Sequence, residues 1–191
     1  MRPRSQLRKV TVHRFRVLPT LVFALLASTF LTAQSLPSGF SLSTVTGGLE
    51  EPTDLEERPD GRLLVLKRNG LLVRIEPWAA GGNPSNHLQL TNVNTVNERG
   101  ALGLALDPNF GANGYFYIYY HHDGTNRGRI SRFTDSGSHA HASSETIIWE
   151  DPEAFGTFAD RYHQGGALEF AEDGTAAGGP MYYMKNRLNM K

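Results

Sequence analysis

The sequence predicts an all-β fold, a partial β-propeller of about two to three blades. A unit of apolar strand, Asp- or Asn-centred turn and second apolar strand occurs three times, within residues 55–76, 97–134 and 166–184. Its turns are dipeptides such as Asp60-Gly61, which favour tight hairpins because Asp, Asn and Gly tolerate positive φ. After the N-terminal segment, no apolar period of 3.6 residues indicates a helix. Short strands that repeat with glycine turns are typical of propellers.

The first 33 residues have the composition of a secretory signal peptide. They hold 6 of the 19 basic residues and no acidic residue, and the apolar run Leu18–Ala33 follows the basic part. Ala33 and Ser35 are small residues that suit cleavage. An uncleaved membrane anchor is the alternative, but the run is shorter than the roughly 20 residues of a span and Pro19 interrupts its start. We therefore expect a bacterial-type signal peptide over residues 1–33 and a periplasmic or secreted protein.

Charge and cysteine content exclude several classes of function. Beyond residue 33 the chain has 13 basic and 19 acidic residues, so neither nucleic acid nor an anionic membrane is an expected partner. The chain has no cysteine, which excludes thiolate zinc sites, iron–sulfur clusters and thiol nucleophiles. An exported protein without disulfides fits a bacterial periplasm or cell exterior.

The first repeat is predicted as a meander. Residues 36–48, with Gly and Ser spacers, predict an extended strand that leads into it. Leu63–Leu66 and Leu71–Ile75 are short apolar strands joined by an Asn69-Gly70 turn. Residues 77–97 are rich in turn residues and predict a connection with one weak strand.

The second repeat gives the strongest strand predictions. Ala101–Leu106 is apolar, and Tyr115–Tyr120 is almost entirely aromatic and β-branched, as buried strands prefer. Arg129–Phe133 and Glu145–Trp149 are predicted to complete the sheet.

The spacing of the repeats predicts how many blades are present. The turns at Asp60, Asp107 and Asp173 lie 47 and 66 residues apart, whereas a typical blade has ~40–50 residues. Propellers need about 4–8 blades, so we expect this chain to be truncated or to be part of a longer one.

Three segments together resemble one known family. They are EPTDLEERPDGRLLVLKRNGLLVRIE (Glu51–Glu76), ERGALGLALDPNFGANGYFYIYY (Glu98–Tyr120) with NRGRISRFT, and YHQGGALEFAEDG (Tyr162–Gly174). They are similar to the soluble glucose/sorbosone dehydrogenases, which are PQQ-dependent aldose sugar dehydrogenases with a six-bladed propeller. The resemblance implies N-terminal blades over residues 36–174 and a divergent or truncated tail over residues 175–191.

The resemblance also implies an active site. His163 falls at the catalytic histidine of the family, and Gln164 and Glu98 fall at positions that contact a small-molecule sugar. PQQ and calcium are the implied cofactors, and the residues that bind PQQ are not identified because they come mainly from later blades. The implied reaction oxidises a sugar hydroxyl to a lactone, and the electron acceptor is unknown. A neutral imidazole can accept the hydroxyl proton, and the glycines after Gln164 permit close approach to the backbone.

Other histidines suggest a metal site only weakly. His121-His122-Asp123 and His139-Ala140-His141 place imidazoles on a common strand face, but neither group has a third ligand at convincing spacing. The sequence therefore predicts no metal site from these residues.

Two other functions remain open at this stage. One is a non-catalytic propeller module that binds carbohydrate or protein, because fold alone does not fix function. The other is a lactonase-type propeller that uses calcium and water, for which only Asp160 and Glu98 are available as ligands.

Overall fold

The computed structural model of the protein describes residues 36–76, 82, 84–152, 165–171 and 176–178. Two units are distinguished, Met1–Leu42 and Ser43–Lys191. In the first unit, the backbone N–H of Phe40 donates to the carbonyl of Pro37 over 3.1 Å. The strand predicted over residues 36–48 is not found, since this segment turns at Pro37 and has no ladder partner within the described residues. No helix in the described ranges is long and apolar enough to cross a membrane.

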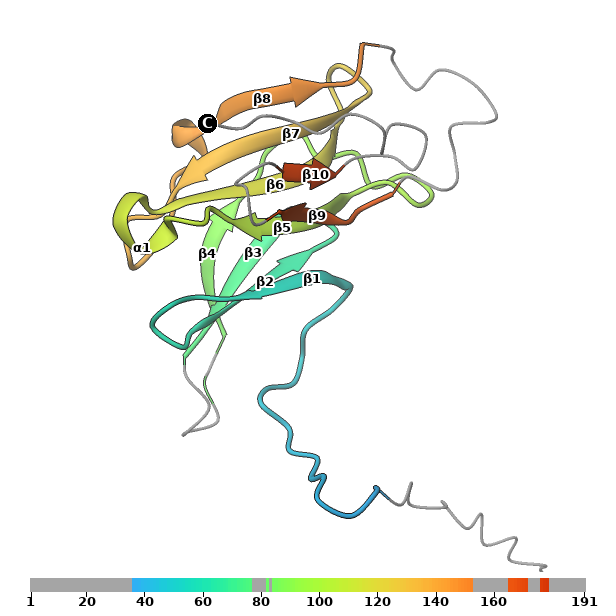
Figure 1. The fold of residues 1–191 in the computed structure, drawn as a ribbon. Coiled ribbons are helices and arrows are strands. Elements are labelled where there is room, and N and C mark those ends of the chain that lie inside the picture. The colour runs from blue at the N-terminus through green and yellow to red at the C-terminus, as the bar shows by residue number, and fades with distance from the viewer. Residues whose placement is uncertain (1–35, 77–81, 83, 153–164, 172–175, 179–191) are drawn as a thin grey trace, which may run out of the picture. The chain divides into compact units, whose positions relative to one another are not determined.

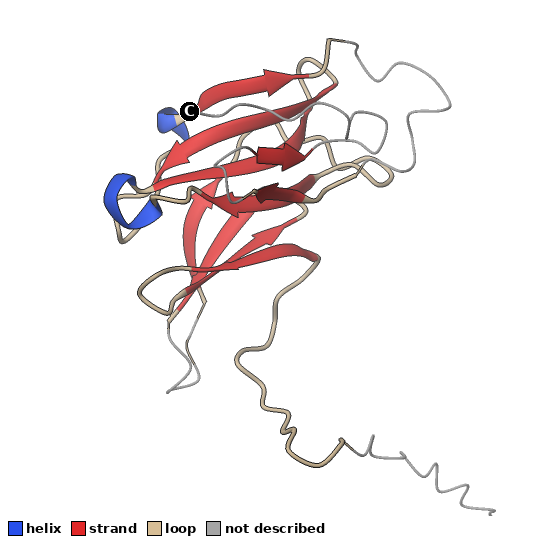
Figure 2. Ribbon diagram, viewed as in Figure 1, coloured by secondary structure: helices blue, strands red, loops and turns tan. Residues whose placement is uncertain are grey.

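The second unit consists almost entirely of antiparallel sheet (Figures 1 and 2). One four-stranded sheet has the order β1-β2-β3-β4, the next has the order β5-β6-β7-β8, and β9 pairs with β10. The strands of the first sheet are β1 (Pro52–Glu57), β2 (Leu63–Lys67), β3 (Leu71–Ile75) and β4 (Ser85–Gln89). Those of the second are β5 (Ala101–Leu106), β6 (Tyr115–His122), β7 (Arg127–Thr134) and β8 (Thr146–Glu150). The remaining elements are α1 (Phe110–Asn113), the 3-10 turn η2 (Ala142–Ser144), β9 (Leu168–Phe170) and β10 (Ala176–Gly178).

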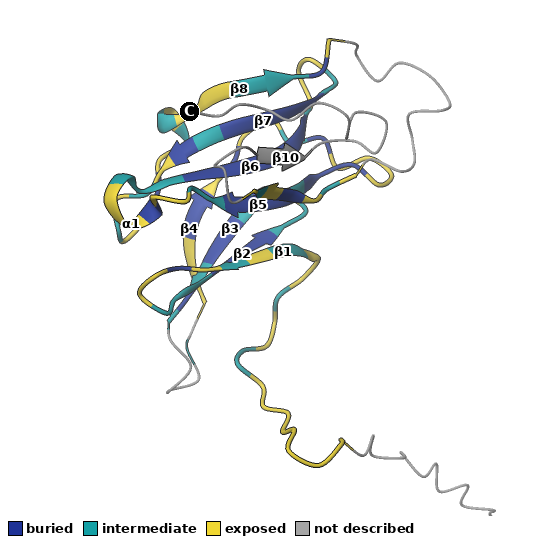
Figure 3. Ribbon diagram, viewed as in Figure 1, coloured by how far each residue is buried: buried dark blue, intermediate teal, exposed yellow. Residues whose placement is uncertain are grey.

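The sheets pack in layers, and each interface has its own apolar core (Figure 3). The largest core lies between the two four-stranded sheets and includes Leu66, Leu72, Phe116 and Phe133. The other face of the second sheet packs against β9 through Tyr117, Tyr119 and Leu168. The other face of the first sheet is covered by Val45 and Leu49.

Burial on both faces explains why the central strands are continuously apolar. In β6, Phe116, Ile118 and Tyr120 belong to the core between the sheets, whereas Tyr117 and Tyr119 face β9. Successive side chains of a strand point to opposite faces, so a strand covered on both faces needs no polar positions. This confirms the prediction of a buried strand at Tyr115–Tyr120.

Three elements, β1, α1 and η2, were not predicted. β1 (Pro52–Glu57) carries three acidic residues and lacks an apolar run, yet it pairs with β2 from Asp54 to Glu57 and again at Pro52, with a register shift between them. The single turn α1 forms because Asp107 accepts from the backbone N–H of Asn109 and Gly114 adopts the left-handed conformation at its C-terminus. Phe110 is its one buried residue, so no periodic pattern could have indicated it.

The first strands of the three sheets, β1, β5 and β9, lie next to one another. β1 contacts β5, and β5 contacts β9, without forming a ladder between them. Sheets packed face to face, with first strands adjacent, are the arrangement of neighbouring propeller blades. The structure thus contains two complete blades and part of a third, as the sequence predicted.

Candidate functional site

A pocket of about 340 Å³ opens where the innermost strands β1 and β5 begin. Thr53 and Asp54 of β1 line one side and Leu102 of β5 another. Gly165, Gly166 and Ala167, which lead into β9, complete the lining. Three neighbouring blades therefore contribute to one pocket.

The glycine pair approaches β5 unusually closely. An ideal Cβ on Gly103 would lie 2.0 Å from the carbonyl oxygen of Gly166, and a Cβ on Gly166 would lie 3.2 Å from the Cβ of Leu102. Gly165 and Gly166 have φ values of 72° and 146°, which disfavour any other residue. The two residues immediately before them are Gln164 and His163, which lie outside the described residues. The close packing therefore fixes where Gly165 and Gly166, which follow the predicted base in the sequence, meet the second blade.

Glu98 lies in the turn just before β5. Its side chain is exposed, and the neighbouring Arg99 is buried. Glu98 is thus within a few residues of Leu102 and Gly103, which the glycine pair touches.

Arg68, at the end of the β2 strand, holds the Glu98 turn. Its Nη1 donates to the carbonyls of Thr95 over 2.7 Å and Asn97 over 3.2 Å, and its Nη2 bonds the carboxylate of Glu51 over 2.8 Å. Its backbone carbonyl accepts from the N–H of Ala101 over 2.9 Å. Sequence analysis missed Arg68, because nothing in an Arg-Asn-Gly turn indicates contacts about 30 residues away.

His121 holds the same turn from the other side. Its backbone N–H donates to the carbonyl of Gly100 over 3.0 Å, and its Nδ1 lies 3.2 Å from that oxygen. Its Nε2 lies 3.3 Å from the hydroxyl of Tyr119, whose pKa is raised by burial and by the charge of Asp151. The imidazole is only 1% exposed. His121 therefore acts as a structural support for the turn and is not a partner of His122 in a metal site.

Asp54 is the charged side chain in the pocket lining. Its Oδ2 accepts from the backbone N–H of Leu104 over 2.8 Å, which ties β1 to β5. Burial raises the pKa of Asp54, with backbone hydrogen bonds opposing and the charge of Glu169 adding to the effect. Burial and the charges of Asp54 and Glu169 likewise raise the pKa of Glu56. The innermost strands therefore carry acidic groups that can accept hydrogen bonds from hydroxyl groups.

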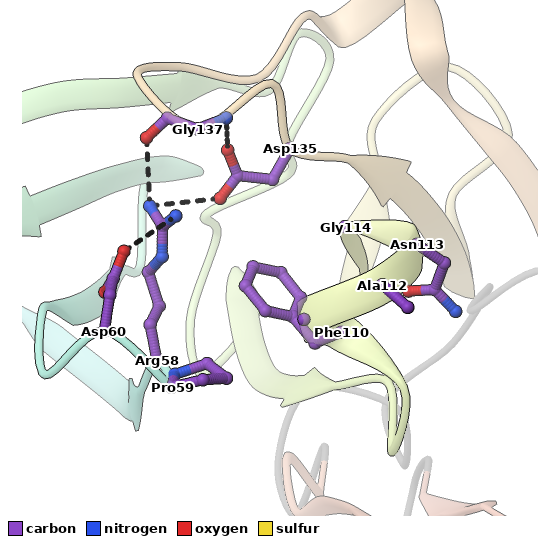
Figure 4. A pocket seen from close by; sticks show the side chains of 10 residues that line it. Arg58, Pro59, Asp60, Phe110, Ala112, Asn113, Gly114, Asp135 and Gly137 are labelled. Atoms are coloured by element: carbon purple, nitrogen blue, oxygen red, sulfur yellow. Dashed lines mark hydrogen bonds and ion pairs between the residues drawn. The ribbon is translucent and has the colours of Figure 1, made fainter.

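A larger pocket, of about 490 Å³, lies at the opposite end of β1 and β5 (Figure 4). Arg58, Asp60 and Asp135 line it together with Phe110 and the rest of α1. Arg58 contacts the carboxylates of Asp60 and Asp135, each over 3.2 Å, and its guanidinium lies 5.5 Å from the centre of the Phe110 ring. The charged groups that line this pocket already pair with one another, and these pairs connect the first blade to the second. The pocket is separate from the Glu98 turn.

Histidines and carboxylates do not form a metal centre with three or more protein ligands in the described part of the chain. No group of three or more His, Asp or Glu side chains could hold an ion there. His122 instead accepts from the backbone N–H of Thr125 over 3.1 Å. Asp160, considered above as a calcium ligand, lies outside the described residues.

The fold is part of a β-propeller, and its innermost strands β1 and β5, together with the segment before β9, line a pocket between blades. The chain belongs to the glucose/sorbosone dehydrogenase family, whose model matches residues 49–177. A comparison with functionally curated proteins found no match.

Solved structures support the same assignment. The PQQ-bound aldose sugar dehydrogenase of Streptomyces coelicolor is 27% identical with a TM-score of 0.61, over 73% of this chain and 40% of that chain. A putative oxidoreductase (glucose dehydrogenase) from Thermus thermophilus is 28% identical with a TM-score of 0.60, over 70% of this chain and 38% of its own. The apo soluble aldose sugar dehydrogenase of Escherichia coli, 20% identical with a TM-score of 0.57 over 67% and 37%, shows the common fold. The chain thus spans 40% or less of the length of these structures.

Proposed function

We propose that the protein is a quinoprotein oxidoreductase of the PQQ-dependent aldose sugar dehydrogenase type, which oxidises a sugar hydroxyl to a lactone. The observation that carries the proposal is the contact between Gly166 and Gly103. Through it, the residues that follow His163 and Gln164 in the sequence pack against β5, which begins three residues after Glu98. Family membership and the PQQ-bound Streptomyces relative supply the class of reaction.

His163 is the proposed general base. Oxidation of a hydroxyl to a carbonyl removes the hydroxyl proton and a hydride from the same carbon, and a neutral imidazole accepts the proton near neutral pH. Glu98 and Gln164 are proposed to orient the sugar. Glu98 is exposed in the turn before β5, where its carboxylate can accept a hydrogen bond from a sugar hydroxyl.

The described residues alone do not fit PQQ. This cofactor carries several carboxylates and needs cations, whereas the charged side chain of the pocket near Gly165 is the carboxylate of Asp54. Arg68, the nearby cation, is engaged by Glu51 and by backbone carbonyls. We therefore assign no step of catalysis to a contact between PQQ and these residues, and PQQ and calcium remain proposals for the whole protein.

Export to the periplasm or cell exterior is proposed from the N-terminal segment. Six basic residues precede the apolar run Leu18–Ala33, in the order typical of a signal peptide. Residues 1–33 are accordingly proposed to be a signal peptide, and residues 175–191 a divergent or truncated tail.

The proposed function is tested by titrating the whole protein, extended to the length of its relatives, with PQQ in the presence of calcium, and by following dye-linked oxidation of aldoses. The expected result is saturable PQQ binding with turnover that is lost in His163→Ala and retained in His122→Ala, a matched control on β6. Turnover that survives His163→Ala would contradict the assigned base. A folded chain that binds sugar without oxidising it would favour the non-catalytic module.

A further inference from the structure

The connection between β7 and β8 presents two imidazoles that meet at the surface. The Nε2 atoms of His139 and His141 lie 2.8 Å apart, and the ring planes are inclined by 84°. Both residues are exposed, while Ala140 between them is buried in the core between the sheets. Alternation along an extended segment therefore places both imidazoles on the solvent side.

The backbone around the two histidines is held on both sides. The N–H of Ala140 donates to the carbonyl of His87 on β4 over 2.8 Å. The carbonyl of His139 accepts from the hydroxyl of Ser136 over 2.6 Å, and that of His141 accepts from the hydroxyl of Ser144 over 2.7 Å. These hydrogen bonds hold the backbone that carries the two imidazoles in place. Less conformational entropy is therefore lost when both imidazoles bind one ligand.

A neighbouring hydroxyl favours the tautomer that a metal requires. The Oγ of Ser138 lies 2.8 Å from the Nδ1 of His139 and can accept a hydrogen bond from the Nδ1–H. The Nε2 of His139 then carries the lone pair that faces His141. A hydrogen bond from the second ring nitrogen is the usual support of a metal-bound histidine.

We propose that His139 and His141 form a surface site for one divalent transition-metal ion, with water filling the remaining positions. Metal–nitrogen bonds of ~2.0–2.1 Å place two ligands about 2.9 Å apart at a right angle and about 3.3 Å apart in a tetrahedron. The separation of 2.8 Å is close to the right-angled value, which suits the square arrangement of Cu²⁺ or Ni²⁺ better than that of Zn²⁺.

Nearby charge does not oppose the ion strongly. Arg74 donates to the carbonyl of Ser138 over 2.5 Å, and its own charge is paired with the carboxylate of Glu76 at 3.2 Å. Without metal, the Nε2–H of His141 can donate to the Nε2 of His139. When the ion binds, that proton moves through solvent to the Nδ1 of His141, so both Nε2 lone pairs of the two neutral imidazoles are free for the ion. The site does not depend on the proposed sugar oxidation, and it goes beyond the sequence analysis, which predicted no metal site at these histidines.

The test is a titration of the full chain, without a polyhistidine tag, with Cu²⁺, Ni²⁺ and Zn²⁺ in turn. Calorimetry gives the stoichiometry and affinity, and electron paramagnetic resonance of the Cu²⁺ form counts the coordinated nitrogens. We expect one ion per chain, bound by two nitrogens and most tightly for Cu²⁺.

Variants then assign the ligands. His139→Gln and His141→Gln should each weaken Cu²⁺ binding by at least about tenfold, and Ser138→Ala by about tenfold through the lost hydrogen bond to Nδ1. His122→Gln is the matched control and should bind as the unaltered chain does. Unchanged Cu²⁺ affinity in the His139→Gln/His141→Gln double variant, or no saturable binding by the unaltered chain, would overturn the proposal. Circular dichroism confirms that each variant is folded.

Discussion

The carbonyl oxygen of Gly166 occupies the space into which a side chain on Gly103 would project, 2.0 Å from an ideal Cβ. Gly103 is in β5 of the second blade, and Gly166 precedes β9 of the third. The two backbones can approach this closely only because neither residue has a Cβ. The contact links the two sheets three residues after His163 in the sequence.

We predict that Gly103→Ala destabilises the protein by about 1–3 kcal/mol, because the added methyl group meets backbone and not a movable side chain. The free energy of unfolding in denaturant measures this loss. Hydrogen exchange should also become faster at residues 165–168, where the strand has to move away.

Gly111→Ala is the matched control. Gly111 lies in α1, and a Cβ there would meet nothing within 4 Å. This substitution should leave stability unchanged or raise it by up to about 1 kcal/mol, because alanine is favoured over glycine in a helix. Equal losses in the two variants would show that the Gly103–Gly166 contact does not determine stability.

A second prediction concerns the turn that carries Glu98. Arg68→Lys retains the charge but removes the fork that reaches the carbonyls of Thr95 and Asn97 together with Glu51. We expect a loss of about 1 kcal/mol in unfolding free energy and faster amide exchange over residues 95–101. Lys67→Arg, one residue earlier, should change stability by less than about 0.5 kcal/mol. Unaltered exchange in Arg68→Lys would mean that other contacts hold the turn.

The sequence predicted the strands of this fold well where burial leaves a pattern. Tyr115–Tyr120 and Ala101–Leu106 are buried on both faces, so their apolar runs identify them directly. β1 escaped prediction because Asp54 and Glu56 lie on an innermost strand, where acidic groups face a pocket or their neighbours. Its pairing with β2 is a tertiary property that local propensity does not contain.

The candidate site was predictable only through the family resemblance. Glu98 lies in a turn. Nothing in the sequence connects this turn to Arg68, which follows β2, or to His121 of β6, although both residues hold it in the structure. The contact between Gly103 and Gly166 spans more than sixty residues and depends on how blades pack. His163 and Gln164 lie outside the described residues, so their roles remain predictions.

A third prediction follows from the raised pKa of Asp54. The folded state binds its proton more tightly than the unfolded state does, so this group's contribution to stability falls as the pH rises above the ordinary value of 3.8. Asp54→Asn retains an acceptor for the N–H of Leu104 but removes the charge, so its stability relative to the unaltered chain should rise over that pH range. Asp54→Ala loses the acceptor and should lower stability by about 1–3 kcal/mol at all pH values. Denaturant unfolding from pH 3.5 to 7 measures both, and a pH-independent difference for Asp54→Asn would refute the assignment.

The last prediction concerns the buried carboxylate of Asp135, which joins the two blades. It lies 3.2 Å from Arg58 and 3.3 Å from the Nε2 of His87, and all three side chains are at most 7% exposed. Burial alone would raise the pKa of Asp135, but the contact with His87, the N–H of Gly137 and the charge of Arg58 outweigh burial and lower it. Its charge therefore stabilises the folded state above the ordinary value of 3.8, and this contribution is lost as the pH falls below that value.

Asp135→Asn should accordingly destabilise the protein by roughly 3 kcal/mol at pH 7, because it leaves the buried Arg58 with one exposed partner. The difference from the unaltered chain should shrink below about pH 4, because there the Asp135 carboxyl of the unfolded chain begins to be protonated while the folded carboxylate, with its lowered pKa, stays charged to lower pH. Asp60→Asn is the control, since that carboxylate is 42% exposed and its removal should change stability by less than about 1 kcal/mol. Unfolding free energies of the three proteins between pH 3 and 7 provide the measurement. Equal effects of the two substitutions at pH 7 would show that burial of the Arg58–Asp135 pair does not hold the blades together.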